Sequence, residues 1–167
     1  MPPLNLHHVL LLFLLSLALC ANSALTGDSA QFQDAHNDAR ARVGAGALNW
    51  NGTLAAKARE MVRQQRNLNS CTVPPLPQNA WYAANMGTSR YDEEARGTVQ
   101  RWAAVGSHYH HDMNTCDKGW SCNSYLQVVW CGTVEVGCSR ATCINRAGRI
   151  NVCLYYPPGN VAGQRPY

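Results

Sequence analysis

The chain has 167 residues, with 14 Lys or Arg against 10 Asp or Glu and a formal net charge of +4. This length suits one domain with a core of its own. The modest positive charge weakly favours acidic cell-wall polymers or membrane surfaces as partners. No basic cluster is interleaved with aromatic residues, so the composition does not indicate a nucleic-acid-binding protein.

The first two dozen residues are typical of a targeting signal. Leu10 to Leu19 is an apolar run that is too short to span a bilayer, and small residues follow it. We expect a signal peptide over residues 1–23, with cleavage between residues 20 and 24, and a single mature domain over residues 24–167. No other stretch is apolar enough to cross a membrane, so we expect a secreted, soluble protein.

The cysteine count indicates disulfides. Of eight cysteines, Cys20 leaves with the signal peptide and seven remain. In a secreted chain these predict disulfide bonds, and their wide spacing does not suit the paired ligands of a zinc site. The odd number leaves one thiol over. The seven are Cys71, Cys116, Cys122, Cys131, Cys138, Cys143 and Cys153.

Two amphipathic helices are predicted in the first part of the mature chain. Apolar residues at helical spacing predict a helix from Asp28 to Val43, ended by Gly44 and Gly46. The same spacing predicts a second helix over residues 54–66. The basic side chains on the outer face of this second helix are Lys57, Arg59, Arg63 and Arg66.

The middle of the chain alternates loops with one more helix. A loop punctuated by prolines is expected over residues 67–90. A third helix is expected to begin near Ser89, with acidic residues in its first turn, where they suit the helix dipole. A polar loop bearing cysteines is expected over residues 106–124. The buried face of the third helix should carry Ala95, Val99 and Trp102.

The last part of the mature chain predicts an antiparallel hairpin. Apolar residues alternate with polar or small ones over residues 134–138 and again over 150–154. Residues 145–148 supply the turn between these strands. Helices followed by strands indicate an α+β domain.

Several short motifs, in this order and at these separations, resemble one family. They are His36-Asn37-Asp38-Ala39-Arg40, Leu48-Asn49-Trp50, Leu54-Ala55-x-x-Ala58, Gln127-Val128-Val129-Trp130, Gly137-Cys138 and the tail Pro157 to Tyr167. The chain resembles the plant pathogenesis-related protein 1 family, in the superfamily of cysteine-rich secretory proteins and insect antigen 5. The resemblance runs from Gln31 to Tyr167. It implies an α-β-α sandwich with a central antiparallel sheet, stabilised by disulfides.

The resemblance also implies a disulfide pairing, which spacing alone leaves open because six cysteines allow fifteen connectivities. Cys131 has no counterpart in the family scheme and is expected to be a free thiol. We expect it to pack as a small apolar residue; the alternative is an exposed thiol that links two chains. The implied pairs are Cys71–Cys143, Cys116–Cys122 and Cys138–Cys153.

Members of the family often hold two His and two Glu in one cleft, a set that can bind a divalent ion. In this chain Ser124 replaces the C-terminal His, and Ala84 and Val105 replace the two Glu. The loop over residues 71–78, which corresponds to the other His, contains no histidine. We therefore transfer no metal ligand, no catalytic residue and no cofactor from the family.

The histidines of the mature chain fall into two groups. His108, His110 and His111 cluster beside Asp112 and could bind a metal, but we interpret them as part of a solvated loop. His36 lies in a family motif, and we interpret it as a packed, hydrogen-bonded core histidine rather than a catalytic base.

Asn51-Gly52-Thr53 is the one acceptable N-glycosylation sequon. It falls between the first two helices, which favours exposure, so we predict a glycan on Asn51. The alternative is that Asn51 caps the second helix. Both uses compete for the same side chain.

The resemblance implies a non-enzymatic plant defence protein, monomeric and secreted to the apoplast or cell wall. Some relatives bind sterols and some are pollen allergens. An apolar, aromatic loop of this chain could line a groove for sterol or another lipid; the alternative is that the loop only covers the core. The loop contains Pro74, Pro75, Leu76, Pro77, Trp81, Tyr82 and Met86.

Two other functions remain open. Residues 157–167 resemble the Pro-x-Gly-Asn-x5-Pro-Tyr signalling peptide that is released from some relatives, although the preceding Cys153-Leu154-Tyr155-Tyr156 departs from the usual Cys-Asn-Tyr-x. The chain would then be a peptide precursor. A metal-dependent hydrolase is the least favoured function, because all four cleft ligands are replaced.

Overall fold

The computed structural model describes residues 25–67, 71–73, 75–77, 79–144 and 148–167. The predicted signal peptide and most of the predicted hairpin turn lie outside the described residues. The helices are α2 (Gly27–Ala41), α3 (Gly52–Asn67), α4 (Ala95–Ala104) and α5 (Asn123–Val129), with the short 3-10 helix η1 (Val105–His108). The strands are β1 (Asn49–Trp50), β2 (Ala83–Ser89), β3 (Tyr109–His110), β4 (Thr115–Cys116), β5 (Glu135–Thr142) and β6 (Arg149–Tyr156).

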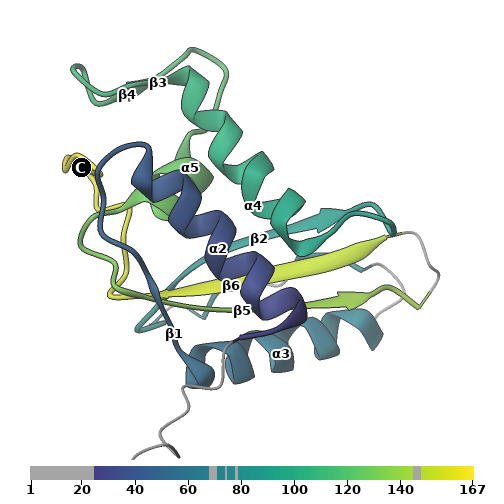
Figure 1. Cartoon of the computed structure of the whole chain (residues 1–167). Coiled ribbons are helices and arrows are strands. Elements are labelled where there is room, and N and C mark those ends of the chain that lie inside the picture. Colours follow the sequence, from purple (N-terminus) through teal and green to yellow (C-terminus); the bar gives the residue numbers. More distant parts are fainter. Residues whose placement is uncertain (1–24, 68–70, 74, 78, 145–147) are drawn as a thin grey trace, which may run out of the picture.

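The elements form three layers, and a four-stranded sheet is the middle layer, as Figure 1 shows. The strand order is β1-β5-β6-β2, and β6 pairs antiparallel with both of its neighbours. The two-residue β1 joins β5 in parallel. Helix α3 covers one face of the sheet, and α2, α4 and α5 cover the other. The predicted α-β-α sandwich is therefore confirmed, and its sheet is antiparallel apart from β1.

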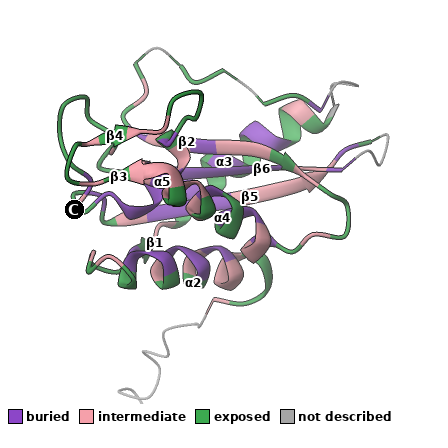
Figure 2. Cartoon of the chain, turned by 90° about the horizontal axis from the view of Figure 1, so that it is seen from above, coloured by how far each residue is buried: buried purple, intermediate pink, exposed green. Residues whose placement is uncertain are grey.

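The two central strands are buried on both faces. Val136 and Cys138 of β5 join the cluster beneath α2 and α4, whereas Val152 and Leu154 of β6 join the cluster beneath α3. Successive residues of a strand point to opposite faces, so one hairpin supplies both halves of the core. Figure 2 shows the buried colour along these strands and on the inward sides of the helices.

Gly137 lets α3 approach the sheet closely. A Cβ atom placed on Gly137 would lie 2.3 Å from the backbone nitrogen of Ala55 and 2.6 Å from the backbone oxygen of Asn51. No side chain fits that gap, and backbone atoms cannot turn aside as a flexible side chain could. The Gly137-Cys138 motif thus has a packing explanation.

Arg40 joins α2 to the segment that ends α5. Its side chain is 1% exposed. Its guanidinium donates to the backbone oxygens of Val128 and Trp130 at 3.1 and 2.8 Å, and to that of Thr133 at 3.0 Å. It also donates to the backbone oxygen of Gly46. A cation at a helix C-terminus is favourable, and here one side chain satisfies several carbonyls.

Three disulfides reinforce this architecture, and they join the pairs that the resemblance implies. Cys71–Cys143 links the segment after α3 to the residue that follows β5. Cys116–Cys122 links β4 to the start of α5. Cys138–Cys153 joins directly opposed residues of β5 and β6.

Several predicted boundaries need correction. The expected loop over residues 67–90 contains β2, which pairs with β6 along seven residues. Helix α4 begins at Ala95, so the acidic residues expected in its first turn precede the helix. Helix α5 begins inside the region predicted as loop, which also contains most of η1 and the β3–β4 pair. The predicted hairpin is confirmed, with longer strands than expected.

Across the described ranges, no helix has both the length and the apolar character that crossing a bilayer requires.

Candidate functional site

The residues that replace the family's cleft ligands lie on two different faces of the four-stranded sheet. Ser124 lies near the start of α5, and its Oγ donates to the backbone oxygen of Trp102 at 3.5 Å. The backbone oxygen of Ser124 accepts a hydrogen bond from Asn85 Nδ2 at 2.8 Å. Val105 lies close by, at the end of α4. Ala84 packs with the cluster beneath α3, on the opposite side of β2 from Asn85. These three side chains therefore do not converge.

The side chains at these positions offer one hydroxyl and two hydrocarbon groups. None is an imidazole or a carboxylate, which are the usual zinc ligands other than thiolates. Among the residues that the structure describes, no group of three or more His, Cys, Asp or Glu is arranged to hold a metal ion.

A hollow of about 310 Å³ borders Val105 and is lined also by Arg101, Ala104, His108 and Trp120. The His108 ring stacks on that of Trp120, with centroids 3.5 Å apart and planes 14° apart. Cationic, aromatic and methyl groups line this hollow, so it has no carboxylate base.

The histidine cluster is organised around an acid that the sequence did not single out. His110 Nε2 lies 2.7 Å and His108 Nδ1 lies 3.0 Å from the two carboxylate oxygens of Asp117. Hydrogen bonds from His110 and His108 lower the pKa of Asp117 below its usual range. His111 turns away, with Nε2 2.7 Å from the backbone oxygen of Tyr167. The neighbouring Asp112 is therefore not the centre of the cluster.

His36 is a core residue, which confirms its interpretation. It is fully buried, and this burial lowers its pKa to about 4. Both ring nitrogens have hydrogen-bond partners inside the protein.

The apolar loop divides into a buried part and an exposed part. Tyr82 is 5% exposed, and Met86 packs against the cluster beneath α3, so these two do cover the core. Trp81 is 53% exposed and Leu76 is 39% exposed. The ring centroid of Trp81 lies 5.5 Å from that of Tyr156, which is also exposed. Pro74, which the sequence also assigns to this apolar loop, lies outside the described residues.

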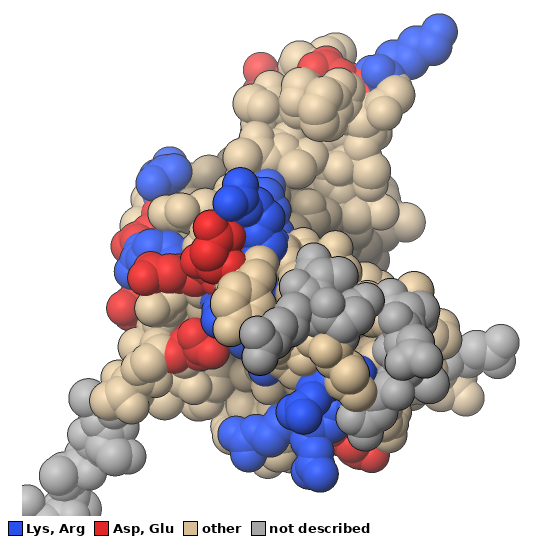
Figure 3. Space-filling view, turned by 90° about the vertical axis from the view of Figure 1, so that its right-hand side faces the viewer, with Lys and Arg blue, Asp and Glu red and all other residues tan. Residues whose placement is uncertain are grey.

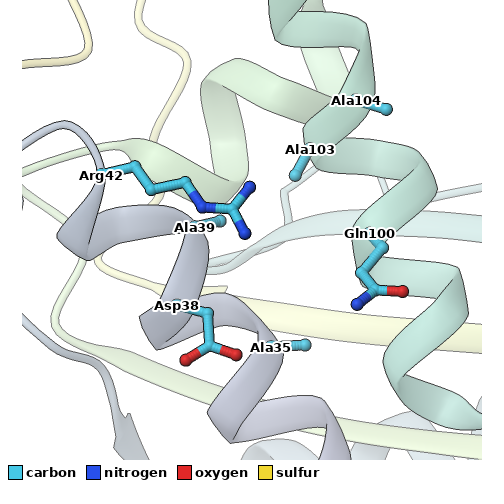
Figure 4. A pocket seen from close by; sticks show the side chains of 7 residues that line it. All are labelled: Ala35, Asp38, Ala39, Arg42, Gln100, Ala103 and Ala104. Atoms are coloured by element: carbon cyan, nitrogen blue, oxygen red, sulfur yellow. The ribbon is translucent and has the colours of Figure 1, made fainter.

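A small cavity of about 140 Å³ lies between α2 and α4, and Figure 4 shows its lining. Alanines form its sides, while Asp38, Arg42 and Gln100 place polar groups around it. Asp38 also pairs with Arg96 at 2.6 Å. The cavity is too small for a sterol, and its polar lining does not resemble a lipid pocket.

Asn51 caps α3, which is the alternative role that the sequence left open for this residue. Its Oδ1 accepts from the backbone nitrogens of Thr53 and Leu54 at 2.8 and 3.0 Å. Its Nδ2 donates to Glu135 at 2.9 Å. Glycosylation of Asn51 stays a prediction.

Cys131 is a free cysteine and is exposed, so the expectation that it packs as a small apolar residue is wrong. It follows Trp130, where the chain leaves α5 for the surface. Its backbone nitrogen donates to the backbone oxygen of Pro166 at 2.7 Å, which holds the tail beside it.

The C-terminal tail packs against the domain at several points. The hydroxyl groups of Tyr125 and Tyr167 lie 2.7 Å apart, and Arg165 donates to the backbone oxygens of His111 and Asp112. Gly159 donates to Gln127 Oε1 at 3.2 Å. Release of residues 157–167 stays a prediction, and it would require these contacts to break.

Residues 33–156 match the model of the Cysteine-rich secretory protein family. The chain belongs to this family. Pathogenesis-related protein 1B of Nicotiana tabacum is 38% identical over 168 residues, covering 100% of this chain and 95% of the relative. STS14 protein of Solanum tuberosum is 36% identical over 82% of this chain; the match spans 64% of that relative's length.

A solved structure shows the same fold. Venom allergen-like protein 4 of Schistosoma mansoni superposes with a TM-score of 0.66 at 24% identity, covering 86% of this chain and 95% of that one. Together with the fold, the plant relatives named pathogenesis-related proteins support a defence protein. The disulfides and these relatives indicate an extracellular protein.

Proposed function

We propose that this chain is a secreted, non-enzymatic plant defence protein of the apoplast or cell wall, which binds sterol or another lipid through an exposed aromatic surface. The observation that carries the proposal is the exposed pair of Trp81 and Tyr156, with Leu76 exposed on the same loop as Trp81. We call Trp81 and Tyr156 the aromatic surface.

Large apolar side chains that are exposed together mark a binding surface more often than scattered ones do. The Trp81 and Tyr156 rings meet edge to face, at 70°, and each keeps part of its surface in water. A flat apolar ring system placed against them would remove that surface from water, which is favourable.

The cleft residues support a non-enzymatic role. Ser124, Ala84 and Val105 provide neither of the ligand types on which the family's metal site depends. Allergenicity stays a prediction from the resemblance alone.

The test is a titration of the mature protein with a radiolabelled sterol. Trp81→Ser should weaken binding by about tenfold to a hundredfold, since burial of one large apolar side chain is worth about 1.5–3 kcal/mol. Trp120→Ser is the matched control, because Trp120 is 55% exposed but lies beside His108. Absence of saturable binding by the parent, or equal losses in both variants, would overturn the proposal.

A further inference from the structure

Three arginines follow one another along the outer side of α3. Arg59, Arg63 and Arg66 are all exposed. They line a groove of about 670 Å³ between α3 and the second half of β5, whose other wall includes Ser139 and Ile144. Figure 3 shows basic side chains gathered low on this face of the molecule. We call this feature the arginine groove.

The charges of the arginine groove have no partner in the described part of the protein. No hydrogen bond or ion pair there involves Arg59, Arg63 or Arg66, and the residues outside it contain no Asp or Glu. The neighbouring acid, Glu60, binds Lys57 at 3.2 Å and Gln64 at 3.4 Å.

Several arginines elsewhere on the surface pair with acidic side chains. Arg90 pairs with Asp92 at 3.0 Å, and Arg96 pairs with Asp38 at 2.6 Å. The arginine groove is therefore a local excess of positive charge, with three unpaired arginines on one groove.

Helix stability does not explain this arrangement. Arg66 lies in the last turn of α3, where a cation suits the helix dipole. Arg59 lies two turns earlier, beyond the reach of that effect. Like charges three and four residues apart destabilise a helix slightly, so repulsion within the row does not help α3 to form.

The geometry points to an acidic polysaccharide, a polyuronate chain, as the occupant: we propose that its successive carboxylates pair with Arg59, Arg63 and Arg66. Guanidinium groups form bidentate pairs with carboxylates. The rise of a helix spaces the three Cα atoms by about 6 Å and about 4.5 Å along the axis. A single small anion would meet only part of such a row.

The shape of the site favours a polymer over a membrane. The arginines border a recess between a helix and a strand, and a chain can enter a recess that a flat bilayer would bridge. Ser139 lies on the side of β5 that faces α3, so its hydroxyl is placed to meet the hydroxyl groups of a sugar. The inference extends the extracellular role proposed above, but it does not depend on sterol binding.

The experiment measures binding of the mature protein to an oligogalacturonate by calorimetry, with the fully methyl-esterified oligomer as an uncharged control. The parent should bind only the charged oligomer, and more weakly as salt rises. Changing Arg59, Arg63 and Arg66 to Gln should weaken binding about tenfold or more. The matched control changes Arg42, Arg90 and Lys118 to Gln, which alters net charge equally and should leave binding nearly unchanged.

Three results would overturn the inference. The methyl-esterified oligomer could bind as well as the charged one, or both triple variants could lose affinity equally. Alternatively, phosphatidylserine vesicles could bind in an arginine-dependent way while the oligogalacturonate does not, which would assign the groove to membranes. Should the triple variant fail to fold, Arg63→Gln against Arg42→Gln gives the same comparison. Trp81→Ser should bind the oligomer normally, which separates this test from the sterol test.

Discussion

The Nε2 atom of His36 lies 2.8 Å from the hydroxyl oxygen of Tyr155, and this contact joins α2 to β6 inside the core. The other ring nitrogen, Nδ1, lies 2.7 Å from the backbone oxygen of Phe32. A carbonyl can only accept, so Nδ1 carries the proton and Nε2 accepts the hydroxyl proton of Tyr155. The folded protein therefore holds His36 as one neutral tautomer.

Stability should fall as the pH drops from about 6.5 toward 4. Burial lowers the pKa of His36 from 6.5 to about 4, so the unfolded state binds more protons across this window. Stability from this group is complete above pH 6.5, and about 3 kcal/mol of it is lost by pH 4. Urea melts at several pH values test this. His36→Gln should have a shallower dependence between pH 4 and 6.5, and an unchanged slope would contradict the assignment.

Arg40→Met should destabilise the domain by about 3 kcal/mol or more, because it leaves buried carbonyls without donors. Arg42→Met is the matched control, since Arg42 directly follows the same helix but is exposed. Denaturant unfolding at neutral pH measures both variants. Equal stabilities for the two would show that the Arg40 contacts contribute little.

Gly137→Ala should destabilise by about 1–3 kcal/mol, because α3 must move away from β5 to admit a methyl group. Gly46→Ala serves as the control, since nothing lies within 4 Å of a Cβ at that position. Thermal melts of the two variants make the comparison. A Gly137→Ala protein as stable as the parent would mean that α3 shifts freely.

The sequon prediction can be separated from the helix cap. Thr53→Ala removes the sequon but keeps the Asn51 side chain that caps α3, so it should lose the glycan and keep its stability. Asn51→Gln should lose both, at a cost of about 1 kcal/mol for the cap. Mass spectrometry of protein from a eukaryotic host, followed by melts, distinguishes them. If the Thr53→Ala protein is lighter than the parent only by the difference between a threonine and an alanine side chain, Asn51 carries no glycan and the prediction is wrong.

Cys131 should react with iodoacetamide in the native protein, because its thiol is free and exposed. Intact-mass analysis should show one adduct without denaturant. Cys131→Ser should show none and should unfold at the same urea concentration as the parent. Labelling that appears only after denaturation would place the thiol inside the structure.

The sequence predicted well the helices and strands in which apolar residues recur with a clear period. The apolar stripe around Phe32 and Ala39 and the alternation around Val152 gave α2 and β6 within a few residues. Strand β2 was missed because Ala83, Ala84 and Gly87 have little intrinsic strand preference. It forms because it pairs with β6, which is a tertiary effect. Helix α5 is only seven residues long, and a short helix gives too little periodicity to recognise.

The candidate site was predictable only in part. The motifs and prolines drew attention to Trp81, yet nothing in the sequence brings it to Tyr156, 75 positions later. The three histidines were visible as a cluster, but Asp117 becomes their partner only because the β3–β4 pair folds the chain back. Cys131 was misjudged because cysteine is usually buried, and the path of the chain after α5 overrides that preference.

The Cys138–Cys153 bond lies in the middle of the hairpin, between residues that face each other across β5 and β6. A slip of one residue would send every side chain of a strand to the other face and would move Gly137 from beneath α3. The covalent link forbids that slip at its centre. The alignment of the strands is therefore set by a covalent bond between them and does not depend on the turn that connects them.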